Sequence, residues 1–121
     1  MLNAESILAS ADLPTESVEV PEWNGTVYVR TMSGTDRDAF EASMIDTKKP
    51  AENGKPAGNL KNIRARLCVL TVCDQNGNRL FTDDQADALG AKSSKALDRV
   101  FEVAQRLNGL GAKDVEALQG N

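Results

Sequence analysis

The pattern that most constrains this chain lies in residues 82–107, which are predicted to form two helices. Thr82 is a favourable N-cap, and Gln85 three residues later completes a capping box. Gly90 is a typical C-terminal stop for the first helix. The Ser93-Ser94 pair then offers a cap for the second helix. This segment is therefore predicted to be a helical pair joined at Gly90.

The second helix of this pair is strongly amphipathic. Its apolar residues recur at i, i+3, i+4, i+7 and i+10, and polar residues take the other faces. The apolar residues are Leu97, Val100, Phe101, Ala104 and Leu107. Asn108-Gly109 is predicted to end the helix. The residues of this pattern are suited to core packing and to a solvated surface, and none of them is suited to chemistry. The chain is therefore predicted to be a scaffold or binding module rather than an enzyme.

Composition narrows the function further. With 121 residues and 40% hydrophobic content, the chain is predicted to form one domain over residues 1–121. The net charge of −4 disfavours nucleic-acid binding. The absence of histidine removes the commonest general base and metal ligand. No apolar run is long enough to span a membrane, and the first residues lack the features of a signal peptide.

The N-terminal third predicts a short helix followed by a β-hairpin. Residues 3–10 are expected to form the helix, with Ile7 and Leu8 available for packing. Valines then alternate with other residues on both sides of Asn24-Gly25, which is a turn signal. Trp23 is expected to cover the core rather than to hold a ligand. The four valines predicted to face the core are Val18, Val20, Val27 and Val29.

At Ser33 the spacing of apolar residues changes from period two, typical of a strand, to period 3.6, typical of a helix. The next helix is therefore predicted to begin there. Thr35 is expected to cap this helix, and Phe40, Met44 and Ile45 are expected to form its inner face. The predicted fold class is therefore α+β and mainly helical, with one N-terminal β-hairpin packed on about four helices.

The segment of residues 47–59 contains prolines, glycines and lysines but no large apolar side chain. Such a composition predicts a mobile surface loop. Lys48 and Lys49, together with Lys55, are candidates for contact with an acidic partner. The alternative is a solvated loop without such a role.

A central helix is predicted over residues 60–73, capped by Asn59 and apolar on every side after Leu67. The alternative for its end is a strand over residues 69–73, because Val-Leu-Thr-Val is β-prone. Cys68 and Cys73 are expected to be buried free thiols. The residues predicted to be close to fully buried are Leu67, Leu70, Val100, Phe101 and Ala104.

The segment that starts at Asp74 has a superficial likeness to an EF-hand calcium loop. An EF-hand requires glycine at position 6 and a bidentate glutamate at position 12. Here Arg79 and Gln85 occupy those positions, so calcium binding is not expected. No phosphate-binding loop or nucleophile motif occurs, and we expect no catalytic residue, no metal and no cofactor.

Four segments in order carry a family resemblance. They are VEVPEWNGTVYVR, SGTDRDAFEAS, NIRARL and DQNGNRLFTDDQADALGAKSSKALDRVFEVAQRLNGL. Over roughly residues 15–118 the chain resembles the tail assembly chaperones of long-tailed bacteriophages. The resemblance implies a protein of the host cytoplasm that is absent from the mature virion. It also implies binding and solubilisation of the tape measure protein, recruitment of tail tube subunits, and in many phages a frameshifted longer form.

The last predicted helix supplies the remaining candidate contacts with a partner. Val115 and Leu118 are its apolar pair, too small to hold such a helix firmly on the domain. Simple docking on the same domain is the alternative for these two residues. The chain is a possible homo-oligomer. The alternative function is a structural tail or head-tail connector or completion component of the virion.

Overall fold

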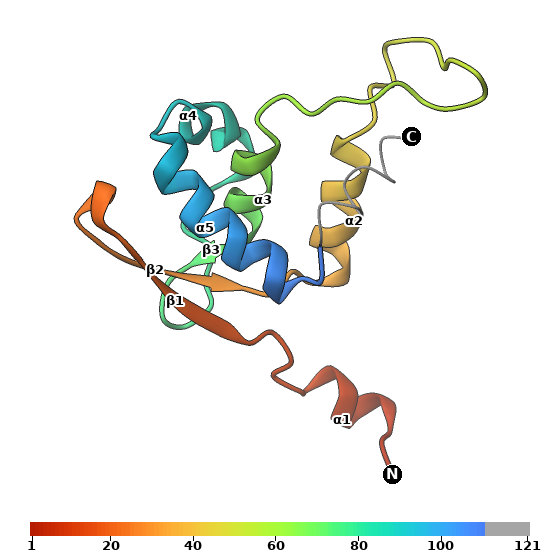
Figure 1. Cartoon of the computed structure of the whole chain (residues 1–121). Helices are drawn as coiled ribbons and strands as arrows, with labels where there is room; N and C mark the ends of the chain where they lie inside the picture. Colours follow the sequence, from red (N-terminus) through yellow and green to blue (C-terminus); the bar gives the residue numbers. More distant parts are fainter. Residues whose placement is uncertain (111–121) are drawn as a thin grey trace.

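The computed structural model describes residues 1–110, in which five α-helices accompany a three-stranded antiparallel sheet (Figure 1). The helices are α1 (Ala4–Leu8), α2 (Gly34–Ser43), α3 (Ile63–Thr71), α4 (Ala86–Gly90) and α5 (Ser94–Leu107). The strands, in sheet order, are β1 (Thr15–Val20), β2 (Gly25–Arg30) and β3 (Val72–Cys73). Short 3₁₀ turns occupy Pro21–Trp23 and Asp83–Gln85. The α+β class is thus confirmed.

The predicted hairpin is present. Val18 lies opposite Val27, and Val20 lies opposite Gly25 at the closed end. Asn24 closes the turn in the left-handed region, with φ of 54°, which asparagine tolerates better than most residues. Of the four valines, Val27 is only partly buried and the other three are buried. The period-two pattern therefore located both the strands and their core face.

The hairpin gains a third strand that the preferred interpretation of the sequence missed. Residues 60–73 do not form one helix, because α3 ends at Thr71 and Val72 turns to extended backbone, with ψ of 127°. Val72 then pairs with Val29, and Cys73 pairs with Tyr28. The strand alternative is right for these last two residues only. As a strand, Val72 and Cys73 form hydrogen bonds with the edge of β2. These bonds would be lost if α3 continued through the two residues.

Two predicted helix caps are wrong. Ser33, and not Thr35, caps α2: its Oγ accepts a hydrogen bond from the Asp36 amide at 3.1 Å. The helix α3 starts three residues later than predicted, after Asn62 in the left-handed region with φ of 55°. Asn59 instead accepts a hydrogen bond from the Lys61 amide at 3.2 Å. Because the Ser33 side chain satisfies the free Asp36 amide in the first turn, the helix begins directly after Ser33.

The helical pair α4–α5 forms as predicted, but Gly90 has a different role from the one expected. The Thr82 amide donates to Gln85 Oε1 at 2.8 Å, and Ser93 Oγ accepts from the Ala96 amide at 3.3 Å. Gly90 ends α4 without adopting a left-handed conformation. A Cβ at Gly90 would lie 2.6 Å from Asn62 Oδ1. Gly90 therefore permits the close approach of Asn62.

The end of α5 is tied to the start of α2. The Gly109 amide donates to the Arg106 carbonyl, and the Leu110 amide donates to the Gln105 carbonyl. Gly109 has φ of 65°, and these two bonds form the Schellman pattern. Asn108 Oδ1 accepts from the Met32 amide at 2.6 Å, and its Nδ2 donates to the Ala104 carbonyl at 2.8 Å. The predicted end at Asn108-Gly109 is thus confirmed.

The buried side chains form one hydrophobic cluster that the sheet, α2, α3, α4 and α5 all share. Leu67, Leu70, Val100 and Ala104 are buried as predicted, whereas Phe101 is only partly buried. On α2 the predicted inner residues Phe40 and Met44 are buried, and Ile45 is exposed. Phe101 belongs to the apolar stripe of α5 but lies at its margin.

The helix α1 extends away from the rest of the described chain (Figure 1). It contributes no buried residue, and Ile7 and Leu8, which were available for packing, are exposed in the described part of the chain. Cys68 and Cys73 are both buried and free, as expected. Within residues 1–110 no helix has the length and apolar character that a membrane span requires.

Candidate partner-binding surfaces

Lys48 and Lys49 lie in the irregular connection between α2 and α3, and both are exposed. The connection starts at an isolated bridge between Ile45 and Gly58 and extends away from the helices (Figure 1). The Lys48 amide donates to Asp46 Oδ1 at 2.9 Å. Within residues 1–110 neither lysine forms an ion pair.

Arg66 fixes the base of this connection. From α3, its Nη1 donates to Ser43 Oγ at 2.9 Å and its Nη2 donates to the Asn59 carbonyl at 2.7 Å. Its Nε donates to the Lys61 carbonyl at 3.0 Å. Burial lowers the pKa of Arg66, although the group remains charged at any working pH. The two ends of the connection are therefore fastened to α3, whereas mobility of residues 47–59 stays a prediction.

A second surface is a small apolar pocket, here called the Trp23 pocket. Its lining comes from the hairpin turn, from Phe81 and from the region of α4: Trp23, Phe81, Gln85, Ala88, Leu89 and Lys92. Its volume of about 270 Å³ lies just below the range of about 300–1,000 Å³ that is typical of small-molecule sites. The size suits one or two apolar side chains of a partner.

Two lysines lie at or near the Trp23 pocket. Lys92 lines it and is exposed, and Lys95 follows in the first turn of α5. Glu22 beside them is engaged by Arg99, whose Nε lies 2.9 Å from Glu22 Oε1. The hydrogen bond from Arg99 also lowers the pKa of Glu22. Lys92 and Lys95 form no ion pair with the described residues.

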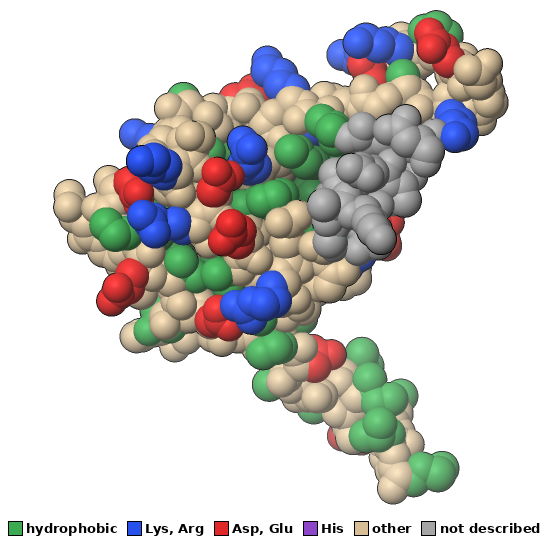
Figure 2. All heavy atoms as spheres, viewed as in Figure 1, with side chains coloured by type: hydrophobic (Ala, Val, Ile, Leu, Met, Phe, Trp, Pro, Cys, Tyr) green, Lys and Arg blue, Asp and Glu red, His purple; other side chains and the backbone are tan. Residues whose placement is uncertain are grey.

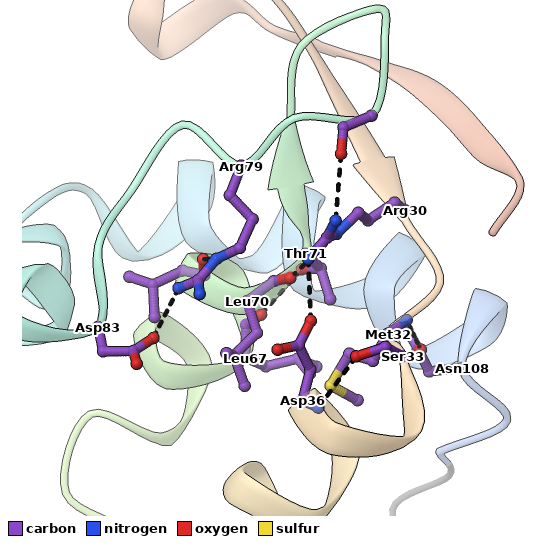
Figure 3. A network of polar contacts seen from close by, with 12 residues as sticks. Arg30, Met32, Ser33, Asp36, Leu67, Leu70, Thr71, Arg79, Asp83 and Asn108 are labelled. Carbon is purple, nitrogen blue, oxygen red and sulfur yellow. Dashed lines mark hydrogen bonds and ion pairs between the residues drawn. The ribbon is translucent and has the colours of Figure 1, made fainter.

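A polar network beneath the sheet has a structural role (Figure 3). Arg30 reaches from β2 to three partners: Asp36 Oδ2 at 2.9 Å, the Gly77 carbonyl at 3.1 Å and the Leu70 carbonyl at 3.4 Å. Carbonyls in the last turn of a helix lack partners within that helix. Arg30 satisfies one of them, which favours the end of α3 at Thr71.

Arg79 completes this arrangement. Its Nε donates to the Val69 carbonyl at 2.9 Å, and its Nη2 lies 2.7 Å from Asp83 Oδ1 (Figure 3). Positive charge at the C-terminal end of a helix is stabilising. The arginines of this network are thus occupied with helix carbonyls and carboxylates, and the network serves the junction of α3 and β3.

Asp74, the first residue of the rejected calcium loop, acts as a turn residue. Its Oδ1 accepts from the amides of Asn76 at 2.8 Å and Asn78 at 3.0 Å, and Gly77 adopts φ of 84°. The amide of Asn78, more than that of Asn76, lowers the pKa of this carboxyl. Within residues 1–110 no group of three or more histidine, cysteine, aspartate or glutamate side chains could hold a metal ion.

The sequence and the structure single out different surfaces. Val115 and Leu118 lie outside the described residues, so their role as partner contacts stays a prediction. The Trp23 pocket was missed because its lining residues come from segments up to about 70 positions apart (23 against 81–92). The nearest signal was the odd position of Trp23 beside a turn.

Comparison with known proteins establishes the family. The family model described as phage tail assembly chaperone matches residues 6–119, and the chain therefore belongs to the phage tail assembly chaperone family. Among solved structures, the bacteriophage HK97 tail assembly chaperone is similar in fold, with a TM-score of 0.60 at 17% sequence identity. That similarity covers 85% of this chain and 94% of the other. The comparison with curated proteins gives no match.

Proposed function

We propose that this chain binds the tape measure protein of its phage, keeps it soluble, and helps recruit tail tube subunits during tail assembly. The observation that carries the proposal is the family match over residues 6–119. The surface is consistent with such a role, because exposed apolar and charged side chains occur together on it. A protein that keeps an apolar client soluble needs both features and no catalytic group.

The proposal includes a location and a fate. The chain acts in the host cytoplasm and is left out of the mature virion, as befits a protein whose work ends when the tail is built. Mass spectrometry of purified virions distinguishes this from a structural tail or connector component. We expect peptides of this chain in lysates of infected cells and none in the virion. Stoichiometric amounts in the virion would favour the structural role.

Contacts with the client are proposed at two places. Lys48 and Lys49 can pair with acidic side chains of the client, and Val115 and Leu118 can supply apolar contact. Pull-down of the tape measure protein by tagged variants tests each pair separately. Lys48→Glu/Lys49→Glu and Val115→Asp/Leu118→Asp should each retain less client than the wild type. The exposed Lys61 provides a control, Lys61→Glu, which should retain client normally.

If both paired variants retain client as well as the wild type does, these residues are not the binding site. The chaperone function itself would still stand in that case. Failure of the wild-type chain to retain the tape measure protein at all would count against the function.

A further inference from the structure

The most conspicuous unpartnered surface of the described chain is the N-terminal arm, defined here as residues 1–13. Ile7 is 53% exposed, Leu8 is 86% exposed, and Leu2 before them is 71% exposed. Figure 2 shows these apolar side chains gathered on the arm, which stands apart from the main body. Single exposed apolar residues need no explanation, but a contiguous apolar group of this kind marks an interaction surface.

The helix in this arm also lacks the means to persist alone. It has five residues, and its fixed contacts are a capping box between Asn3 and Ser6 together with its own backbone hydrogen bonds. Isolated helices shorter than about 12–15 residues are marginal in water. Ala4, Ile7 and Leu8 fall on one face at i, i+3 and i+4, which is the spacing of a face that packs. The helix is therefore expected to be stabilised by a surface that receives this face.

The Trp23 pocket has the complementary character. The arm carries Glu5 and Asp12 and no basic side chain, whereas Lys92 lines the pocket and Lys95 stands near it. Among the described residues that line the pocket, only Lys92 is charged. Of the acids nearby, Glu22 pairs with Arg99, whereas Asp84 and Asp87 are exposed and form no ion pair with the described residues. We propose that α1 of one copy of this chain docks in the Trp23 pocket of a second copy.

The direction of the arm favours a second copy over the same chain. The arm precedes Thr15, which lies opposite Arg30 at the open end of the hairpin. Trp23 lies in the turn at the closed end, beyond Val20. The arm extends away from the body at that open end (Figure 1), so docking at home would require a reversal of its direction at Leu13-Pro14.

An arm that enters a different surface on the next copy makes a head-to-tail contact. Such contacts repeat, and they generate rings or open filaments instead of closed dimers. The inference goes beyond the proposed function, since it concerns the purified chain alone. Its test is therefore independent of any client.

The experiment measures mass by light scattering and sedimentation over a range of concentrations, for three forms of the full chain. The arm variant, Ile7→Gln/Leu8→Gln, removes apolar surface without changing charge and uses a good helix former. The pocket variant, Ala88→Glu, places an acid where the acidic arm would dock, at an exposed position of α4. Ser10→Gln in the arm and Ala51→Glu in the α2–α3 connection are the matched controls.

We expect the mass of the wild type and of both controls to rise with concentration, and each variant alone to stay monomeric. The decisive sample is an equimolar mixture of the two variants. One contributes an intact pocket and the other an intact arm, so the mixture should stop at two copies. As a second measurement, Lys92→Glu should weaken association by at least about tenfold, and Glu5→Lys/Asp12→Lys in the same chain should restore it.

Three results would overturn the inference. A wild type that stays monomeric at all concentrations would show that the arm binds a client or docks on its own chain. Variants with the mass of the wild type would show association through another surface. A mixture of variants that remains monomeric would remove the pairing of arm and pocket. Equal circular dichroism of all forms establishes that the exposed substitutions leave the fold intact.

Discussion

Asn108 offers the sharpest test of how the fold is held together. It is 8% exposed, and its side chain links the last turn of α5 to the chain just before α2. In Asn108→Ala the Met32 amide, in a residue that is 6% exposed, loses its acceptor. An unsatisfied buried donor costs about 1–3 kcal/mol, and loss of the bond to the Ala104 carbonyl costs about 1 kcal/mol more. We expect a loss of about 2–4 kcal/mol in the free energy of unfolding.

Urea melts followed by circular dichroism measure this loss of free energy. In thermal melts the same loss should lower the Tm by about 10 °C in a chain of this size. Glu102→Ala, an exposed substitution on the same helix, is the control and should change stability by less than about 0.5 kcal/mol. If Asn108→Ala behaves like the control, the link between α5 and α2 does not stabilise the fold as described.

Three further predictions concern the core, a close approach and a thiol. Leu67→Ala should cost about 2–5 kcal/mol in urea melts, and Phe101→Ala should cost less because Phe101 is partly exposed. Gly90→Ala should destabilise despite the better helix propensity of alanine, since its Cβ would lie 2.6 Å from Asn62 Oδ1; adding Asn62→Gly should recover most of the loss, and no recovery would refute the contact. Burial raises the pKa of the Cys68 thiol from 9.0 to about 12, so a thiol reagent at about pH 8 should modify it only on unfolding. The native state retains this proton, and stability should fall as the pH rises from 9.0 toward about 12.

The sequence predicted those elements whose signals are local. The hairpin follows from alternating valines around Asn24-Gly25, and α5 follows from its serine cap, its apolar stripe and its closing glycine. Such signals act within a few residues, so one sequence suffices to detect them.

The misassigned elements depend on distant residues. Val72 and Cys73 become a strand because β2 offers them partners, and α3 stops at Thr71, where Arg30 and Arg79 satisfy its last carbonyls. Period alone does not separate helix from strand in so short an apolar run. The role of Gly90 likewise depends on Asn62, which lies in another helix end.

The candidate site was less predictable than the fold. The exposure of Lys48 and Lys49 could be inferred from loop composition, whereas the Trp23 pocket forms only when the hairpin turn meets α4. No pattern along the chain specifies that meeting. The failure of Ile7 and Leu8 to pack was also not visible, because their spacing is the same for a docked and an undocked helix.

We propose above all that this member of the phage tail assembly chaperone family keeps the tape measure protein soluble. The most direct measurement is the soluble fraction of that protein when it is expressed with and without this chain. We expect the tape measure protein to aggregate alone and to become soluble, in a complex with this chain, on co-expression. An equally insoluble tape measure protein in the two samples would contradict the proposed chaperone function.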